Sequence, residues 1–513
     1  MITDTKKLIL PIIFLIFFAI TLTLQSCKKN RSDISKILYA KTQNKVFKNV
    51  TQEGFAEVFQ QVLTNEKSKM ANPQFITTYY KKNGYDPVFV MDHLFNGDLK
   101  SAIGYYQKSN EHGLDPKLFK ADEITTLINK FYNKDGIKTL EEAYHDMAEL
   151  ELLTANSLIT YSNALQYGVI NPKNIYARYY TVTKRPDSAS MSHIFHENNL
   201  KTYLDSIQPK DPQYLALQKA LMSGYQASGI SKEETQRLII VNLERLRWKN
   251  KPAENKYVII NIPDYTLNVM DSGKSVLHMK VCVGEGRNKN NTYNLVNYTD
   301  SATIDRPFSR ETPQLNSLIH SVQVNPVWNI PKSIATKEII KEAADDPYYL
   351  SNKGIAVYKN DVKVEDIESI DWADAVKDGS EYEFKQQPGA DNALGKIKFL
   401  FKNKSSVYLH DTPAKAAFEK AKRDISHGCV RLGDPQGLAL QLFGQGSKYD
   451  KIVEYMSSDN PDPTTINLPN KVPVYITYIT CWADASGNLQ VRQDVYGLDV
   501  VLYATLKKNK IIL

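Results

Sequence analysis

Cysteine is scarce in this sequence and occurs at only four of 513 positions. No Cys-x-x-Cys or His-x-x-x-His spacing accompanies these residues, which disfavours a zinc site. Lys and Arg exceed Asp and Glu by only 64 to 57, and no block of them is dense enough to indicate nucleic-acid binding. Internal repeats and low-complexity tracts are also missing. What is present, 42% apolar and 24% charged residues, is typical of a folded protein longer than one domain.

The first 27 residues have the order of an export signal. Lys6 and Lys7 give a positive start, residues 8–24 are almost wholly apolar, and Leu-Gln-Ser-Cys at 24–27 ends the run. This ending resembles the lipobox of bacterial lipoproteins, which implies that Cys27 is lipidated and becomes the mature N-terminus. The alternative is an uncleaved membrane anchor, because the run approaches the roughly 18 residues that span a bilayer. Either interpretation places the rest of the chain outside the cytoplasm.

The other cysteines differ in their surroundings. If Cys27 is lipidated, three remain, and an odd number leaves at least one free thiol in an exported chain. Cys282 lies within the strand-like run 279–283, and Cys481 directly follows another such run. We expect both to be small core residues. Cys429 instead ends the polar stretch Ser-His-Gly-Cys.

Three segments of different character follow the signal. Residues 28–49 are mostly polar and predict a tether. Residues 50–250 carry apolar residues at helical spacing, with Pro and Gly between the segments, which predicts a helical domain. Residues 251–513 contain β-rich runs instead and predict a mostly β domain. The predicted fold class is therefore α+β.

The β-rich half also predicts individual elements. The runs at 257–262, 266–270 and 273–284 predict consecutive hairpins. An Asn-, Asp- and Thr-rich stretch at 287–307 predicts an enlarged loop. Further strands are expected at 321–324, 355–358, 396–401, 406–409, 472–480 and 489–491, and helices at 414–423 and 436–443.

The residues that carry chemistry lie in two stretches, Tyr-Leu-His-Asp-Thr-Pro at 408–413 and Ser-His-Gly-Cys-Val-Arg-Leu at 426–432. A thiol needs a nearby base to become a good nucleophile, and a third group must orient that base. His410 precedes Cys429 by 19 residues and ends a predicted strand, and the intervening helix can return the chain towards it. We therefore predict Cys429 as a nucleophile and His410 as its base.

Two neighbours of the predicted nucleophile suit the same chemistry. Gly428 lets a substrate carbonyl approach the backbone, where the N–H of Cys429 and its neighbours would form an oxyanion hole. Arg431 supplies positive charge that favours a thiolate or holds a substrate carboxylate. Taken singly, a Cys is usually a buried apolar residue, and His410, His427 and Cys429 could also ligate zinc. Their combination in an exported chain favours the catalytic interpretation.

The whole pattern resembles a known family. A histidine, a spacer of fifteen residues, and Ser-His-Gly-Cys followed by an apolar residue and Arg are similar to the catalytic site of the L,D-transpeptidase (YkuD-type) domain. The resemblance covers roughly residues 70–505 and is closest to large Gram-negative members, which carry an N-terminal scaffold domain. Supporting similarities are Asn-Leu-Glu-Arg-Leu-Arg-Trp at 242–248, Asn-Pro-Val-Trp-Asn-Ile-Pro at 325–331, Pro-Gly-Ala-Asp-Asn-Ala-Leu-Gly at 388–395 and Asp-Val-Tyr-Gly at 494–497.

The resemblance implies a peptidoglycan cross-linking enzyme without cofactor or metal. Cys429 would attack the carbonyl of the third residue of a tetrapeptide stem and expel the terminal D-alanine. His410 would take the thiol proton, oriented by the main-chain carbonyl of Asp411. The side-chain amine of a neighbouring stem would accept the acyl group, giving a 3→3 cross-link. Residues expected to support catalysis, place the substrate or line the donor cleft are Tyr408, Asp411, Ser426, His427, Gly428, Arg431, Thr312, Pro313 and Trp328.

Other uses of the same residues stay open. Water in place of the amine gives an L,D-carboxypeptidase, and a protein amine gives attachment of an envelope protein to the wall. A vestigial site would leave a wall-binding lipoprotein. The resemblance and the signal predict a periplasmic protein anchored through its lipid, in a membrane that the sequence does not identify. Relatives usually insert a peptidoglycan-binding domain before residues 242–248, whereas here residues 214–236 run directly into that helix.

Overall fold

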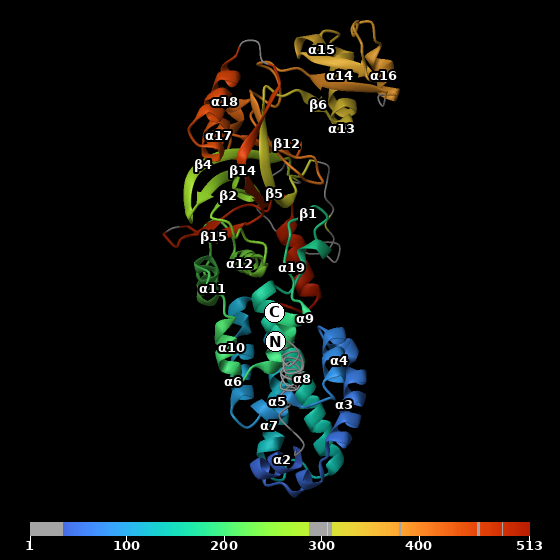
Figure 1. Cartoon of the computed structure of the whole chain (residues 1–513), viewed down its shortest axis with the longest axis vertical. Helices are drawn as coiled ribbons and strands as arrows, with labels where there is room; N and C mark the ends of the chain where they lie inside the picture. The colour runs from blue at the N-terminus through green and yellow to red at the C-terminus, as the bar shows by residue number, and fades with distance from the viewer. Residues whose placement is uncertain (1–33, 287–304, 306–309, 379–380, 459–461, 485) are drawn as a thin grey trace, which may run out of the picture. The chain divides into compact units, whose positions relative to one another are not determined.

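The computed structural model describes residues 34–286, 305, 310–378, 381–458, 462–484 and 486–513 (Figure 1). The predicted signal with Cys27, and nearly all of the predicted loop at 287–307, lie outside these residues. No described helix is both long and apolar enough to span a bilayer. The chain forms two compact units. Unit 1 holds the residues up to 108 with 116–162 and 187–207, and unit 2 holds residues 109–115, 163–186 and 208–513.

Unit 1 is helical, as the sequence predicts. Short polar side chains begin several of its helices: Thr51 accepts a hydrogen bond from the N–H of Gly54, and Asp187 forms a reciprocal capping box with Ser190. The helices are α2 (Ile34–Thr42), α3 (Gln52–Glu66), α4 (Pro73–Lys82), α5 (Val88–His93), α6 (Asp98–Gln107), α7 (Ala121–Tyr132), most of α8 (Leu140–Tyr167), α9 (Ser188–His193) and α10 (Leu200–Ser206).

The prediction of a tether was wrong for residues 34–49, which belong to the fold of unit 1. Ile34 and Leu38 are one helical turn apart on α2 and are both buried. Phe47 is buried in the 3-10 helix Lys45–Asn49, and the Asn44 side chain donates a 2.7 Å hydrogen bond to the carbonyl of Ile137. The prediction rested on the mostly polar composition of the segment and did not take account of these three buried apolar residues.

Unit 2 is organised by a ten-stranded sheet, which confirms the predicted β character. Pairing runs in the order β1-β5-β10-β11-β13-β4-β3-β2-β14, and β14 also pairs with β5, so the path closes on itself. The predicted hairpins are the antiparallel strands β2, β3 and β4. The strands are β1 (Tyr179–Tyr180), β2 (Lys256–Asn261), β3 (Thr266–Asp271), β4 (Lys274–Gly284), β5 (Gln314–Val324), β10 (Ile397–Phe401), β11 (Leu409–His410), β12 (Asp424–Ser426, beside β4), β13 (Val430–Leu432) and β14 (Thr464–Thr477).

A lobe is inserted between β5 and β10 and has its own four-stranded sheet (Figure 1). Its buried core includes Ile340, Val357, Trp372 and Phe384. The sequence predicted only its strand at 355–358. The elements of this inserted lobe are β6 (Trp328–Ile330), α13 (Lys332–Ile334), a π-helical turn (Ala335–Ile339), α14 (Ile340–Asp345), α15 (Tyr349–Asn352), β7 (Ile355–Lys359), β8 (Val362–Lys363), α16 (Trp372–Asp378) and β9 (Tyr382–Gln386).

The helix that ends in Asn-Leu-Glu-Arg-Leu-Arg-Trp is part of the core of unit 2. It is α12 (Lys232–Arg247), and its buried Arg245 forms an ion pair with Asp499 of α19 (Leu498–Lys508). Glu244 pairs with Arg247 at 2.7 Å. The helix α11 (Pro212–Ser223) precedes α12 with a short connection, as expected from the missing insertion. Two short strands, β15 (Cys481–Ala483) and β16 (Leu489–Val491), also belong to unit 2.

One predicted helix differs from the structure. Residues 414–423 form only a 3-10 turn (Lys415–Glu419), after which the chain is extended and enters β12. The Arg423 guanidinium donates to the carbonyls of Val281 and Tyr265 at 3.2 and 3.1 Å, and these tertiary bonds compete with a longer helix. The helix predicted at 436–443 is confirmed as α17 (Pro435–Phe443), and α18 (Ser447–Ser457) follows.

Candidate active site

The sheet brings the two predicted catalytic residues together. β11 and β13 pair in parallel, with His410 opposite Arg431 and Leu409 opposite Val430. Cys429 immediately precedes β13, and the N–H of Val430 bonds to the carbonyl of Tyr408 at 3.1 Å. Adjacent strands therefore replace the helical return that the sequence predicted between residues 410 and 429.

Both residues line one cavity of about 440 Å³. Its remaining predicted members are Trp328, Tyr408, Ser426, His427 and Arg431. Residues that the sequence analysis had not singled out also line it: Arg178, Arg310, Lys337, Glu338, Tyr349 and Leu394. The cavity thus has a cysteine and a histidine within a predominantly cationic wall.

The His410 ring is held in one orientation. Its Nδ1 lies 2.5 Å from the carbonyl oxygen of Asp411, and because a carbonyl can only accept, Nδ1 carries the proton. Burial, with the charge of Arg431 as the next cause, lowers the pKa of His410 to about 4. The imidazole is therefore neutral at pH 7, with Nε2 able to accept a proton. The Asp411 carboxylate points elsewhere, to the N–H of Lys396 at 2.9 Å and to Lys415 at 2.5 Å.

The Cys429 thiol is neutral as well. Burial raises its pKa to about 11, and this effect exceeds the opposing ones from Tyr408, Arg431 and Lys398. The main chain and the hydroxyl of Tyr408 both favour the thiolate and so lower the pKa of Cys429. Burial thus outweighs the neighbours that favour the thiolate, so the sulfur carries its proton until a base removes it.

Ser426 shapes the turn that presents the nucleophile. Its hydroxyl donates to the carbonyl of Cys429 at 2.5 Å and accepts from the N–H of Gly428 at 3.1 Å. Gly428 has φ +114°, a conformation that residues with a Cβ rarely adopt. A Cβ at this position would still have room, with its nearest neighbour at 3.5 Å. Backbone conformation is therefore a stronger reason for glycine here than the close approach of a substrate.

A buried hydrogen-bond network fixes the other side of this turn. Thr312 donates from its hydroxyl to the carbonyl of Gly428 at 2.8 Å and accepts from the N–H of Gly284 at 2.8 Å. The Tyr496 hydroxyl donates to the carbonyl of Gly284 at 2.8 Å and accepts from the N–H of Thr312 at 3.2 Å. Tyr496, in the Asp-Val-Tyr-Gly similarity, thus supports the turn that contains Gly428 through hydrogen bonds. Thr312 supports the same turn and does not line the cavity.

Comparisons with known proteins agree with this arrangement. A family model described as an L,D-transpeptidase catalytic domain matches residues 255–453, and one described as a scaffold domain matches residues 74–221. Residues 255–453, which include His410 and Cys429, are therefore similar to an L,D-transpeptidase catalytic domain. A curated protein of Haemophilus influenzae, named "Putative L,D-transpeptidase", is 30% identical over 272 residues, which are 52% of this chain and 50% of that protein. The chain thus spans about half the length of this curated relative.

The inserted lobe contributes charged side chains to the cavity of Cys429. Glu338, in the π-helical turn, lies 2.8 Å from Nε2 of His427 and also pairs with Arg310, which pairs with Glu285 at 2.9 Å. Single π-helical turns frequently lie at functional sites. His427 is therefore engaged by a carboxylate on the cavity wall, whereas the ring of His410 bonds to the main-chain carbonyl of Asp411. Nothing in the local sequence around residue 338 indicates this long-range pair.

Lys398 and Arg431 both act electrostatically on Cys429, and of the two only Arg431 was predicted from the sequence. Lys398 is a charged residue inside the apolar run of β10, opposite His410, and its ammonium lies 5.3 Å from the centroid of the Tyr408 ring. Burial lowers its pKa, while Cys429 opposes that change. Arg431 has a buried Nε with no hydrogen-bond partner among the described residues. A lysine in a predicted buried strand is the one sequence clue that would have found Lys398.

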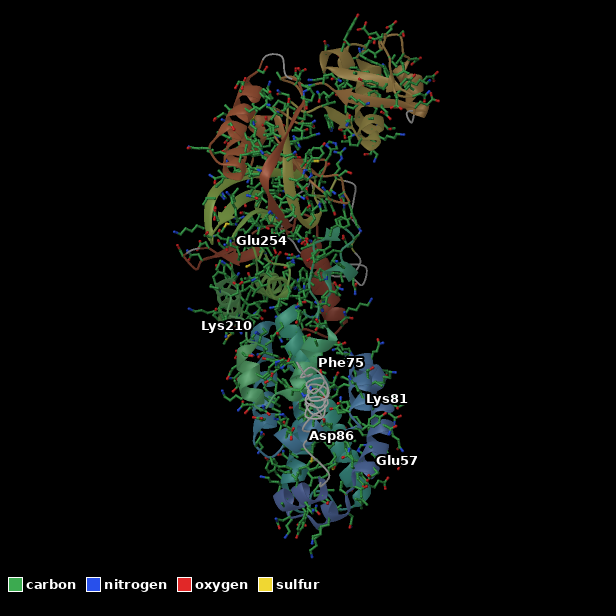
Figure 2. The ribbon with its side chains drawn as sticks, viewed as in Figure 1. Glu57, Phe75, Lys81, Asp86, Lys210 and Glu254 are labelled. Carbon is green, nitrogen blue, oxygen red and sulfur yellow. The ribbon has the colours of Figure 1, made fainter. Side chains whose placement is uncertain are left out.

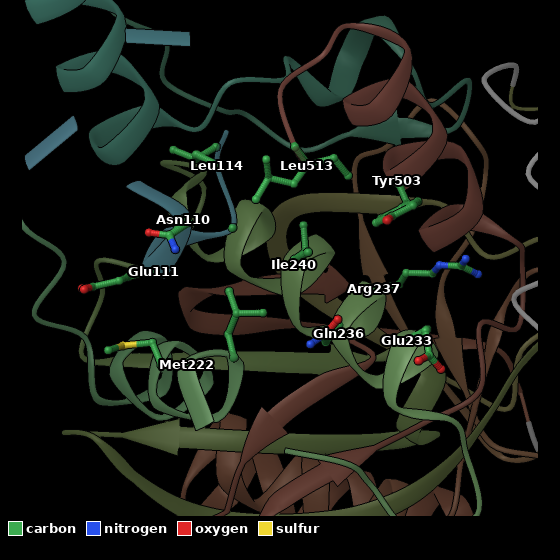
Figure 3. A pocket seen from close by; sticks show the side chains of 13 residues that line it. Asn110, Glu111, Leu114, Met222, Glu233, Gln236, Arg237, Ile240, Tyr503 and Leu513 are labelled. Carbon is green, nitrogen blue, oxygen red and sulfur yellow. The ribbon is translucent and has the colours of Figure 1, made fainter. Parts of the chain in front are cut away.

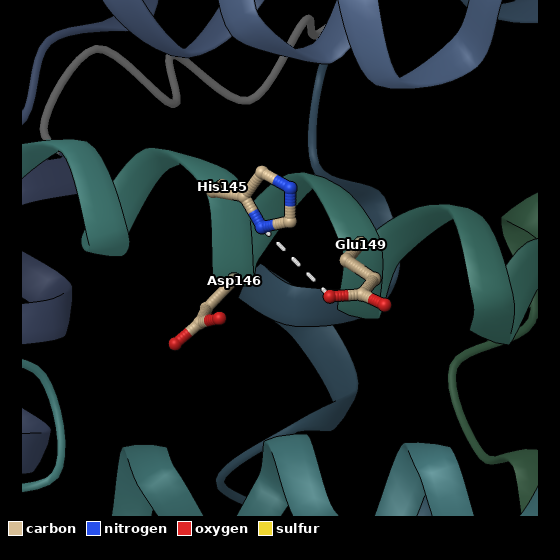
Figure 4. A group of neighbouring side chains, drawn as sticks. All are labelled: His145, Asp146 and Glu149. Atoms are coloured by element: carbon tan, nitrogen blue, oxygen red, sulfur yellow. Dashed lines mark ion pairs between the residues drawn. The ribbon is translucent and has the colours of Figure 1, made fainter. Parts of the chain in front are cut away.

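A zinc site made by His410, His427 and Cys429 is not supported within the described part of the chain, because their ligand atoms do not converge. The one group of three converging ligand atoms found there is His145, Asp146 and Glu149 on α8 (Figure 4). Asp146 already pairs with Lys130 at 2.9 Å, so an ammonium neutralises part of that cluster. We assign no metal to it.

A second cavity of unit 2, of about 590 Å³, lies beside α11, α12 and α19 (Figure 3). Met222, Ile240, Tyr503 and Leu513 line it together with charged residues such as Glu233. Neither Cys429 nor His410 belongs to its lining. This cavity is therefore separate from the one that Cys429 and His410 line.

Proposed function

We propose that this protein is a peptidoglycan L,D-transpeptidase that forms 3→3 cross-links through a thioester on Cys429. One observation carries the proposal: a neutral imidazole, fixed by the carbonyl of Asp411, lines the same cavity as the neutral thiol of Cys429. A neutral imidazole is the form that can accept a proton, and a neutral thiol has one to give.

In the first step, Cys429 Sγ attacks the carbonyl of the third residue of a tetrapeptide stem. Nε2 of His410 accepts the thiol proton during the attack, so a C–S bond forms as the S–H bond breaks. His410 then donates this proton to the departing nitrogen as the C–N bond breaks, and D-alanine leaves. Because the thiol pKa is about 11 and the imidazole pKa about 4, proton transfer accompanies the attack, and no ion pair stands ready beforehand.

In the second step, the side-chain amine of another stem attacks the thioester. The amine loses a proton to His410, a C–N bond forms, and Cys429 leaves as a thiol once it regains that proton. Both steps place negative charge on the carbonyl oxygen of the substrate. The N–H of Cys429 is the candidate donor to this oxygen, because the N–H of Gly428 is already bonded to Ser426.

The charge of the cavity suits an acidic peptide. Arg178, Lys337 and Arg431 line it, and Arg431 carries the unpartnered Nε. Stem peptides bear free carboxylates, which guanidinium groups bind well. We assign Arg431 to a carboxylate of the donor stem, since Arg431 lies on the strand next to His410.

The location follows from the N-terminal sequence. The protein is a periplasmic lipoprotein in this proposal, with Cys27 lipidated and the catalytic domain outside the cytoplasm. The support is the Leu-Gln-Ser-Cys sequence after an apolar run. Mass spectrometry of the mature N-terminal peptide tests it: a diacylglyceryl adduct on Cys27 is expected, and an N-terminus at Met1 would contradict it.

Purified protein incubated with disaccharide-tetrapeptide muropeptides tests the activity. Cross-linked dimers with release of D-alanine are expected, and Cys429→Ala should abolish them while the matched Cys481→Ala variant keeps them, because Cys481 is a buried residue outside the cavity. Tripeptide alone would indicate the L,D-carboxypeptidase, and a product only with a protein amine would indicate wall attachment. Intact-protein mass spectrometry with a carbapenem should show one adduct, lost in Cys429→Ala. If the muropeptides give no product and the carbapenem gives no adduct, the remaining interpretation is a wall-binding lipoprotein without activity.

A further inference from the structure

Unit 1 contains a cavity of about 820 Å³ between α4 and α9. It belongs to neither the transpeptidase site nor any motif that the sequence analysis singled out. Its volume lies within the range of small-molecule sites, roughly 300–1,000 Å³. The lining residues are Asn72, Pro73, Gln74, Phe75, Thr78, Tyr79, Lys82, Ser188, Met191 and Ser192.

Two aromatic rings form part of its wall. Phe75, which is labelled in Figure 2, and Tyr79 are one turn apart on α4. Their ring centroids are 6.2 Å apart, and both side chains are half-buried. Phe195 stacks on Tyr79 at 3.8 Å and lies 6.2 Å from Phe75, which holds both rings in place. Rings supported in this way lose little conformational entropy when a ligand packs against them.

The polar side chains of the wall have free hydrogen-bonding capacity. Asn72 is the N-cap residue of α4, yet its side chain makes no capping hydrogen bond. The side chains of Gln74, Ser188 and Ser192 likewise have no hydrogen-bond partner among the described residues. Amides and hydroxyls each donate and accept, so this wall can pair with a ligand that carries many neutral polar groups.

The charge of the cavity separates it from the catalytic one. Its lining contains one ammonium, that of Lys82, and no carboxylate. The absence of carboxylates there disfavours a metal ion or a cationic peptide, and a single exposed lysine is weak support for a polyanion. A neutral ligand with apolar faces and a rim of hydroxyl and amide groups fits best, and this is the chemistry of an N-acetylated sugar.

We propose that the cavity between α4 and α9 binds the saccharide backbone of peptidoglycan, with Phe75 and Tyr79 against sugar rings and Asn72 and Gln74 on N-acetyl or hydroxyl groups. The inference rests on the proposed function for the identity of the polymer. It adds a second contact to that polymer, on a compact unit that does not contain Cys429.

The test uses the full chain carrying Cys429→Ala, so that binding is measured without turnover. Calorimetry with the β-1,4-linked tetramer of N-acetylglucosamine should show one binding site. Phe75→Ala should lower the affinity for the tetramer at least about tenfold, because it removes one aromatic contact with the sugar. The matched control is Phe95→Ala, another half-buried phenylalanine of unit 1 outside the cavity, which should bind as the parent does. Thermal unfolding of each variant reports whether the fold is kept.

Three results would overturn the proposal: no heat with the tetramer, equal affinities of Phe75→Ala and Phe95→Ala, or binding of an acidic stem peptide in place of the sugar. If Phe75→Ala fails to fold, Asn72→Ala and Gln74→Ala serve instead, because both side chains are free of internal bonds. If the protein binds the saccharide but the parent protein forms no cross-links, the proposed transpeptidase activity is refuted and the proposed saccharide site stands. If it forms cross-links but does not bind the saccharide, the saccharide site is refuted and the proposed activity stands.

Discussion

The protonation state of the nucleophile gives the sharpest prediction. Burial raises the pKa of Cys429 from 9.0 to about 11. At pH 8 an ordinary thiol with that starting value is roughly 10% thiolate, whereas Cys429 is roughly 0.1% thiolate, so its alkylation should be about a hundredfold slower. The logarithm of the rate should rise linearly with pH up to pH 10 without a plateau.

The assay is alkylation by iodoacetamide between pH 6 and 10, followed by peptide mass spectrometry that separates Cys429 from Cys282 and Cys481. Denatured protein supplies the reference, since all three thiols are then free of burial and should titrate near the starting value of 9.0. Tyr408→Phe keeps the ring and removes a hydroxyl that lowers the pKa of Cys429, so it should slow alkylation further. A plateau of the alkylation rate below pH 9, or faster alkylation of Tyr408→Phe than of the parent protein, would show that Cys429 is a thiolate at rest.

Three further perturbations have defined outcomes. The pKa of His410 falls to about 4 in the folded state, so the unfolded state binds more protons below pH 6.5. The free energy of unfolding should therefore decrease as the pH drops from 6.5 towards 4. Urea titrations at pH 7 and pH 5 should show a smaller decrease for His410→Gln than for the parent protein. Gly428→Ala should cost about 1–3 kcal/mol through its φ of +114° and abolish the carbapenem adduct, as denaturation and mass spectrometry would report. Arg245→Met leaves Asp499 buried without its partner and should destabilise unit 2 by about 3–5 kcal/mol, with recovery in Arg245→Met/Asp499→Leu. An unchanged midpoint for any of these would contradict the role given to that residue.

Local patterns in the sequence indicated the candidate catalytic pair and much of the fold. The α+β organisation follows from a change of hydrophobic period, which is read over short windows. The β2-β3-β4 hairpins follow from alternation between turns. Cys429 and His410 were identifiable because the residues next to each are themselves constrained: Ser426 and Gly428 build the turn, and the carbonyl of Asp411 orients the ring.

Long-range packing decided what the sequence did not predict. Glu338 meets His427 across 89 positions, and Thr312 reaches Gly428 across 116, so neither contact leaves a local pattern. The segment 34–49 folds because three apolar residues find a core, although its composition is that of a tether.

The protonation of the active site also belongs to the tertiary structure. Sequence alone identified a thiol and an imidazole with a cation nearby, and that set favours an ion pair. Burial reverses the outcome, because the cost of removing a charge from water depends on everything packed around the group and on no single neighbour. The residues were therefore determined by the sequence, and the fold determined that both are neutral at rest.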